Sequence, residues 1–70
     1  MNKVLDPVEI GERLRKLRGI RTRQGAADEI GISYSALAKY EKGYKVPNDR
    51  TKVLIANYYG VSVQKIFFAP

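Results

Sequence analysis

The sequence predicts an all-α domain, a compact bundle of five short helices, and three observations support this fold class. Apolar residues recur at helical spacings of three and four in several segments. A capping residue precedes each of these segments, and most of them end at a glycine. No stretch alternates apolar and polar residues for long enough to predict a strand. With 70 residues, 44% of them hydrophobic, the chain has the size of one domain with a small core.

The first helix is expected from about Pro7 to Arg18. Asp6 suits the N-cap position, and proline is favoured directly after a cap because it lacks an amide hydrogen. Gly19 is expected to end the helix. The predicted buried stripe consists of three residues at spacings of four and three: Ile10, Leu14 and Leu17.

The second and third helices follow closely. The second is expected over about Arg23–Ile30, with Thr22 as its N-cap. The third is expected over Tyr34–Lys42, with Ser33 as its N-cap and Gly43 as its end.

The remaining two helices complete the predicted core. Asn48 is expected to cap the fourth helix and Gly60 to end it. Its apolar residues are Val53, Leu54, Ile55, Ala56 and Tyr58. Ser62 is expected to cap a short fifth helix with Val63 and Ile66. Phe67 is expected to complete the core, and Phe68 to be an exposed contact.

The second and third helices fit a helix-turn-helix over residues 23–42, because the segment between them meets its steric demands. Ala27 is small enough for the helices to cross closely, and Gly31 can adopt the positive φ that turns the chain. Ile32 and Leu37 can fill the angle between the helices, and Tyr40 continues the buried face. The alternative is an ordinary helical hairpin, which would require neither the alanine nor the glycine at these places.

The charge of the chain favours a polyanionic partner. Thirteen Lys and Arg against seven Asp and Glu give a net charge of +6. The stretch from Arg13 to Arg23 contains six of these cations and no acid, which favours nucleic acid over a solvated surface. Within it, Arg13, Arg15 and Lys16 are expected to add long-range attraction without making contacts.

Three stretches of the chain resemble the lambda-repressor-like, Cro-type (XRE) helix-turn-helix domain. They are AADEIGISYSALAKYEKG at residues 26–43, the following Val46-Pro47, and VLIANYYGVSVQKIF at residues 53–67. The resemblance covers about residues 10–67 and leaves residues 1–9 and 68–70 as short terminal extensions. It implies a five-helix DNA-binding domain of a kind commonly found in dimeric repressors. It also implies that Arg18 and Glu41 bridge the first and third helices. The chain departs from the family pattern at Arg23, which replaces the usual glutamine, and in the turn from Gly19 to Thr22, which is shorter than usual. Ala26 also replaces the customary leucine.

The third helix is the predicted DNA-contacting element, because its polar side chains share the face opposite Leu37 and Tyr40. The candidates for contact with bases are Ser33, Tyr34, Ser35, Ala38 and Lys39. The candidates for contact with phosphates are Thr22, Arg23, Gln24, Lys42, Tyr44, Lys45 and Asn48. Two alternatives remain open: Tyr34 could bind a phosphate instead of a base, and Tyr44 could be a half-buried loop aromatic.

Other function classes are disfavoured. Without His or Cys the usual metal sites and nucleophiles are lacking, and the acids are too scattered for paired catalysis, so we expect no enzyme, cofactor or metal. No apolar run could span a bilayer, so we expect a cytoplasmic protein without membrane association. The expected function is sequence-specific transcription regulation, with double-stranded DNA as partner. The simplest form is a homodimeric repressor at a palindromic operator, with an interface expected on the fourth and fifth helices and the C-terminal tail, motivated by Tyr58, Tyr59 and Phe68. The alternative is an antitoxin-like module that masks a partner protein.

Overall fold

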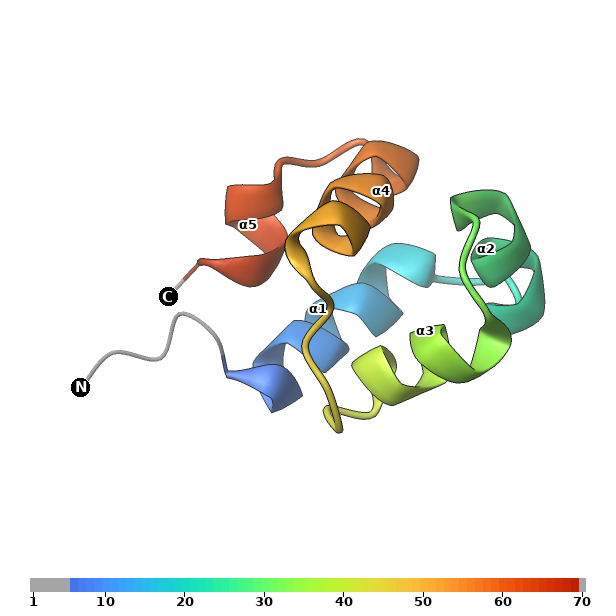
Figure 1. The fold of residues 1–70 in the computed structure, drawn as a ribbon, viewed down its shortest axis with the longest axis horizontal. Helices are drawn as coiled ribbons and strands as arrows, with labels where there is room; N and C mark the ends of the chain where they lie inside the picture. Colours follow the sequence, from blue (N-terminus) through green and yellow to red (C-terminus); the bar gives the residue numbers. More distant parts are fainter. Residues whose placement is uncertain (1–5, 70) are drawn as a thin grey trace.

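The computed structural model describes residues 6–69, and within them it contains the five predicted helices (Figure 1). They are α1 (Pro7–Arg18), α2 (Arg23–Ile30), α3 (Tyr34–Glu41), α4 (Asp49–Tyr59) and α5 (Val63–Phe67). The all-α fold class is therefore confirmed. Helix α3 ends one residue earlier than predicted, because Lys42 is its C-cap and Gly43 turns away with φ of 78°. Residues 1–5 and 70, which the sequence assigns to terminal extensions, lie outside the described residues.

Each helix begins where the side chain of the N-cap residue accepts a hydrogen bond from a backbone amide of the first turn. The five N-caps are those predicted: Asp6, Thr22, Ser33, Asn48 and Ser62. The Thr22 hydroxyl, for example, accepts from the Gly25 amide at 3.0 Å. Such a cap contributes about 0.5–2 kcal/mol, so these residues fix the helix boundaries chemically.

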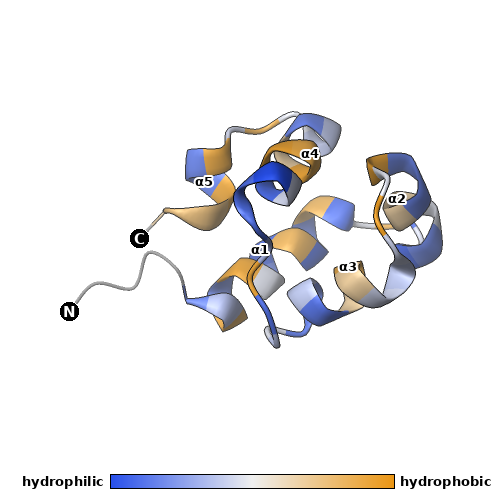
Figure 2. Ribbon diagram, in the orientation of Figure 1, coloured by the Kyte–Doolittle hydropathy of each residue, from blue (hydrophilic) through white to orange (hydrophobic). Residues whose placement is uncertain are grey.

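The main core is built mostly from α1, α4 and α5, and Ile30 of α2 and Tyr40 of α3 also belong to it. Figure 2 shows apolar segments along each of α1, α4 and α5. The largest apolar side chains there are fully buried: Ile10, Leu14, Ile55, Ile66 and Phe67. A second, smaller cluster of Ala26, Ala27 and Leu37 joins α2 to α3. The core therefore holds the helix-turn-helix against the rest of the domain.

Gly11 allows α1 and α3 to approach closely, a contact that was not predicted from the sequence. A Cβ atom at this buried position would lie 2.4 Å from the carbonyl oxygen of Glu41. Real side chains do not tolerate that separation, so the crossing of the two helices requires glycine here. The crossing places the C-terminal end of α3 against α1.

The C-terminal segment differs from expectation at one residue. Phe67 is buried as predicted, but the prediction of an exposed Phe68 is wrong. The Phe68 ring packs against the core, and the ammonium group of Lys52 lies 5.1 Å from its centroid. The exposed apolar side chains of this region are instead Val53 and Leu54 on α4, at 48% and 37% exposure.

No helix within residues 6–69 combines the length and the hydropathy that crossing a membrane requires.

Candidate nucleic-acid interface

The turn between α2 and α3 has the geometry that the sequence predicts. Gly31 adopts the left-handed conformation, with φ of 94° and ψ of 30°. The amides of Gly31 and Ile32 both donate to the carbonyl oxygen of Ala27, at 2.9 and 3.0 Å. These bonds pair a carbonyl at the end of α2 while the chain changes direction.

The predicted packing of the motif is also present. Ala27 and Leu37 are fully buried in the same cluster, and Ile32 packs against it. Tyr40, one turn further along α3, belongs to the main core. One side of α3 is thus fixed to the domain.

The opposite side of α3, which we call the outward face, consists of Tyr34, Ser35, Ala38, Lys39 and Lys42. Four of these side chains are exposed and Ala38 is half-buried. Ser33, directly before the helix, is exposed as well, but its hydroxyl oxygen accepts from the Ala36 amide at 3.0 Å. Ser33 therefore acts as a cap and has its hydroxyl proton left to donate.

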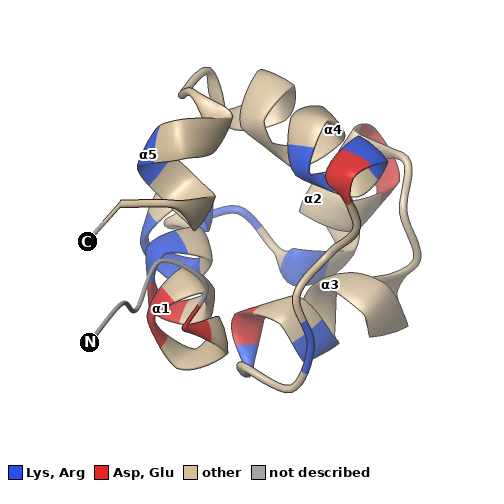
Figure 3. Ribbon diagram, turned by 60° about the vertical axis from the view of Figure 1, so that its left-hand side comes forward, with Lys and Arg blue, Asp and Glu red and all other residues tan. Residues whose placement is uncertain are grey.

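The residues predicted to contact phosphates lie at two places beside the outward face. At the start of α2, Thr22 and Gln24 are exposed, while Arg23 is half-buried. In the loop after α3, Tyr44 is 76% exposed, so the alternative of a half-buried Tyr44 is wrong. Lys45, in the same loop, is exposed, and Figure 3 shows the basic segments of α3 and this loop near each other.

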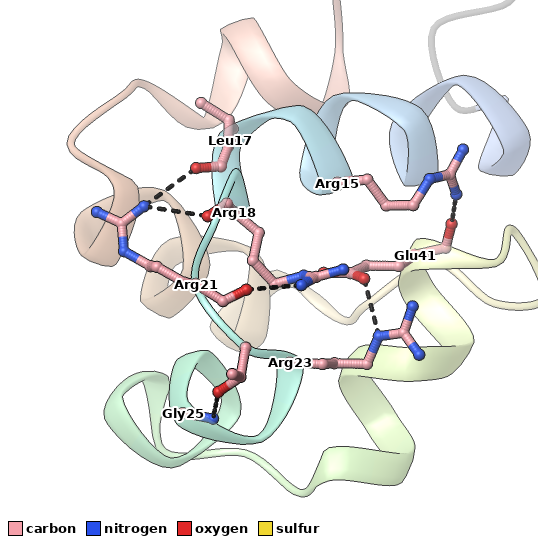
Figure 4. Close-up of polar contacts among 8 residues, drawn as sticks. Arg15, Leu17, Arg18, Arg21, Arg23, Gly25 and Glu41 are labelled. Carbon is pink, nitrogen blue, oxygen red and sulfur yellow. Dashed lines mark hydrogen bonds and ion pairs between the residues drawn. The ribbon is translucent and has the colours of Figure 1, made fainter.

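A buried carboxylate connects the three helices of this region (Figure 4). The Glu41 side chain is fully buried and accepts from Arg18 Nε at 2.8 Å and from Arg23 Nε at 2.9 Å. Arg15 donates from Nη1 to the backbone carbonyl of Glu41. The bridge between Arg18 and Glu41, expected from the family resemblance, is confirmed. The second arginine of the network, Arg23, was expected to contact a phosphate, and its ion pair with Glu41 was not predicted.

Arg23 has a further contact that bears on the outward face. Its guanidinium carbon lies 5.9 Å from the ring centroid of Tyr34. The hydrogen bond to Glu41, and secondarily the neighbouring Tyr34, raise the pKa of Arg23 by favouring its charged form. The Glu41 carboxylate, which Arg23 shares with Arg18, compensates part of the positive charge of Arg23 inside the protein. The sequence shows that Arg23 replaces the family's glutamine. The ion pair between Arg23 and Glu41 is seen only in the folded structure.

Arg13 and Arg15, which were expected to add only long-range attraction, donate to backbone carbonyls within the protein. Arg13 donates to the carbonyl oxygens of Ile66, at 2.8 Å, and Ala69, at 3.0 Å. These carbonyls lie at the C-terminal end of α5, where the helix leaves them without intrahelical partners. A guanidinium group has enough donors to satisfy both, and it complements the negative end of the helix dipole. Lys16 is exposed, and its ammonium group forms no ion pair within residues 6–69.

Comparison with solved structures shows how widely this fold recurs. The restriction-modification controller protein C.AhdI from Aeromonas hydrophila matches with a TM-score of 0.80 and 23% identity, over 89% of this chain and 97% of that one. The P22 c2 repressor, solved with a synthetic operator, matches with a TM-score of 0.76 and 23% identity, over 83% and 91%. A transcriptional regulator of the HTH_3 family from Vibrio cholerae matches at 27% identity and a TM-score of 0.77; 93% of this chain covers 38% of that protein.

Sequence comparisons give a sharper assignment. No curated protein matches the chain. The family model described as helix-turn-helix, HTH_3, matches residues 12–66, which include α2, the turn, α3 and α4 in full. On this evidence the chain belongs to the XRE-type helix-turn-helix family HTH_3, a family of DNA-binding transcription regulators.

Proposed function

We propose that the protein is a sequence-specific repressor that binds a palindromic operator as a homodimer, with α3 in the major groove. The observation that carries this proposal is the two-sided character of α3. Leu37, Tyr40 and Glu41 fix one side to the domain, and the outward face presents polar, basic or small residues together with the aromatic Tyr34. An α-helix of this kind fits the width of the major groove of B-DNA.

The outward face offers specific chemistry to base edges. Ser35 can donate to or accept from a base, and Lys39 can donate to the acceptors of guanine. Ala38 can contact a thymine methyl group. Tyr34, at the start of α3, is 46% exposed and lies beside Arg23, and its ring can contact a base edge. We assign these four residues to base contact.

The flanking residues supply contacts to phosphates. The first amides of α2 have no intrahelical partners and lie at the positive end of its dipole, which suits a phosphate between Thr22 and Gln24. Lys42, Tyr44, Lys45 and Asn48 form a second strip around the loop after α3. Arg23 contributes less charge to DNA than a free arginine, because Glu41 compensates it.

A homodimer is expected because one small domain contacts too few base pairs for high specificity. The structure changes the residues that motivate the interface. Tyr58, Tyr59 and Phe68 are all partly buried against the core, so the exposed Val53 and Leu54 become the main candidates. The similarity in fold to the P22 c2 repressor, which was solved with a synthetic operator, supports operator binding by this chain.

Selection of bound duplexes from random DNA tests the proposal. The expected result is an enriched inverted repeat whose half-sites are about one helical turn apart. Sedimentation at tens of micromolar, with and without the selected duplex, should show two protein chains per site. Enrichment of no sequence would refute the specificity, and a single chain bound per site would refute the dimer.

A further inference from the structure

The groove between α1 and the C-terminal segment is unrelated to the outward face. It has a volume of about 370 Å³ and lies between Lys16 and Leu17 of α1 on one side and residues 61–69 on the other. Ile66, almost fully buried, contributes to its apolar lining together with the half-buried Leu17, Val61 and Ala69. Its volume and lining fall in the range of small-molecule sites, which are mostly apolar with a few polar groups.

The polar groups at this groove are all cationic. They are Arg13, Lys16 and Lys65, and no acidic residue lines the groove. Figure 3 shows basic segments of α1 and α5 on the same side of the molecule. Arg13 donates to the carbonyl oxygens of Ile66 and Ala69, so it forms part of the groove wall and is not free to bind a ligand. Lys16 and Lys65 are exposed, and neither ammonium group forms an ion pair with a carboxylate of residues 6–69.

From this arrangement we propose that the groove binds a small amphipathic carboxylate, with its chain against Leu17, Val61 and Ile66 and its carboxylate between Lys16 and Lys65. An apolar lining alone would fit many occupants, but the two ammonium groups select an anionic head. An extended peptide fits less well, because Arg13 already satisfies the backbone carbonyls on this side and leaves a peptide chain few backbone partners. The inference does not depend on the proposed DNA binding.

Octanoate is a suitable probe, because it carries an eight-carbon chain and stays monomeric at millimolar concentration. Titration followed by amide resonances of the isotope-labelled full chain should show saturable shifts around residues 16–17 and 61–69. The expected dissociation constant is roughly millimolar, from the efficiency typical of small ligands. Acetate, which lacks the chain, and octanol, which lacks the charge, should each bind at least tenfold more weakly.

Variants assign the binding to this groove. Lys16→Ala with Lys65→Ala should weaken octanoate binding about tenfold, whereas Arg50→Ala, which removes an exposed cation of α4 outside the groove, should not change it. Ala69→Trp should fill the groove and abolish binding, and circular dichroism checks that this variant is folded. Equal affinity for octanol and octanoate, or full affinity in either the lysine or the tryptophan variant, would overturn the proposal. A change of oligomeric state on Ala69→Trp without octanoate binding to the parent would also overturn it, in favour of an interface between copies.

Discussion

Replacing Glu41 with alanine should destabilise the domain more than any other change of one charged side chain. The carboxylate is fully buried and accepts charge-assisted hydrogen bonds from Arg18 and Arg23 at 2.8 and 2.9 Å. Without it, two guanidinium groups that are only 17% and 22% exposed lose their counter-charge. Removing one member of a buried ion pair destabilises by about 3–5 kcal/mol.

That loss is large for a chain of this size. Small domains have a free energy of unfolding of about 0.05–0.15 kcal/mol per residue, or roughly 4–10 kcal/mol for this chain. The midpoint of thermal unfolding should therefore fall by at least about 12 °C, since each kcal/mol shifts a domain of this length by about 4–8 °C. Glu41→Gln should lose less than Glu41→Ala, because the amide oxygen still accepts one hydrogen bond.

Urea unfolding followed by circular dichroism measures the effect, and the chain supplies a matched control. Glu9 pairs with Arg13 at 3.4 Å, but its side chain is 42% exposed, so Glu9→Ala should change the free energy of unfolding by less than about 1 kcal/mol. If Glu41→Ala lowers the free energy of unfolding no more than Glu9→Ala does, Arg18 and Arg23 must become solvated without a cost in stability. The network of Glu41 would then not be what joins α1, α2 and α3.

Three further predictions concern the fold. Gly31→Val should destabilise markedly while Gly31→Asn loses less, because only backbone strain at φ of 94° opposes a side chain there and asparagine tolerates it best; equal melting of the two would refute this. Gly11→Ala should destabilise by about 1–3 kcal/mol despite the better helix propensity of alanine, because its Cβ would meet the Glu41 carbonyl; a melting point at or above the parent's would contradict it. Burial raises the pKa of Tyr59 to about 12, whereas an unfolded tyrosine titrates near 10, so the free energy of unfolding should fall between pH 10 and 12 as only the unfolded chain loses this proton. Tyr59→Phe should reduce that fall and leave the free energy of unfolding at pH 7 unchanged, because the buried hydroxyl has no hydrogen-bond partner among the described residues. Urea unfolding at pH 7 and between pH 10 and 12 measures both effects, with Tyr44→Phe as the control.

Local rules explain why the helices and the turn could be predicted from the sequence. Caps such as Thr22 and Ser33 act on amides two or three residues away, and Gly31 meets a conformational demand of its own backbone. The same holds for the outward face, because the spacing of Leu37 and Tyr40 already determines which side of α3 is buried.

Features that depend on contacts across the fold could not be predicted in this way. Gly11 has no local function within α1. Glycine is needed there because a Cβ atom would lie too close to the backbone carbonyl oxygen of Glu41 in α3. Arg13 is separated from its acceptor Ile66 by 53 residues, so no pattern along the chain connects them. Phe68 was expected to be exposed because it is close to the end of the chain, whereas its burial depends on packing against the core beside Lys52.

The central claim, that α3 distinguishes base sequence, is tested most directly by comparing two lysine variants of equal charge. Lys39 lies on the outward face of α3, and Lys65 lies on α5 beside the groove. Affinities of the parent, Lys39→Ala and Lys65→Ala for the selected operator and for random duplex give the specificity ratio at fixed salt. Lys39→Ala should lower this ratio by roughly 5- to 150-fold, the equivalent of about 1–3 kcal/mol for one lost base contact, while Lys65→Ala leaves it unchanged. An unchanged ratio in Lys39→Ala, or an equal fall in both variants, would contradict base recognition by this face of α3.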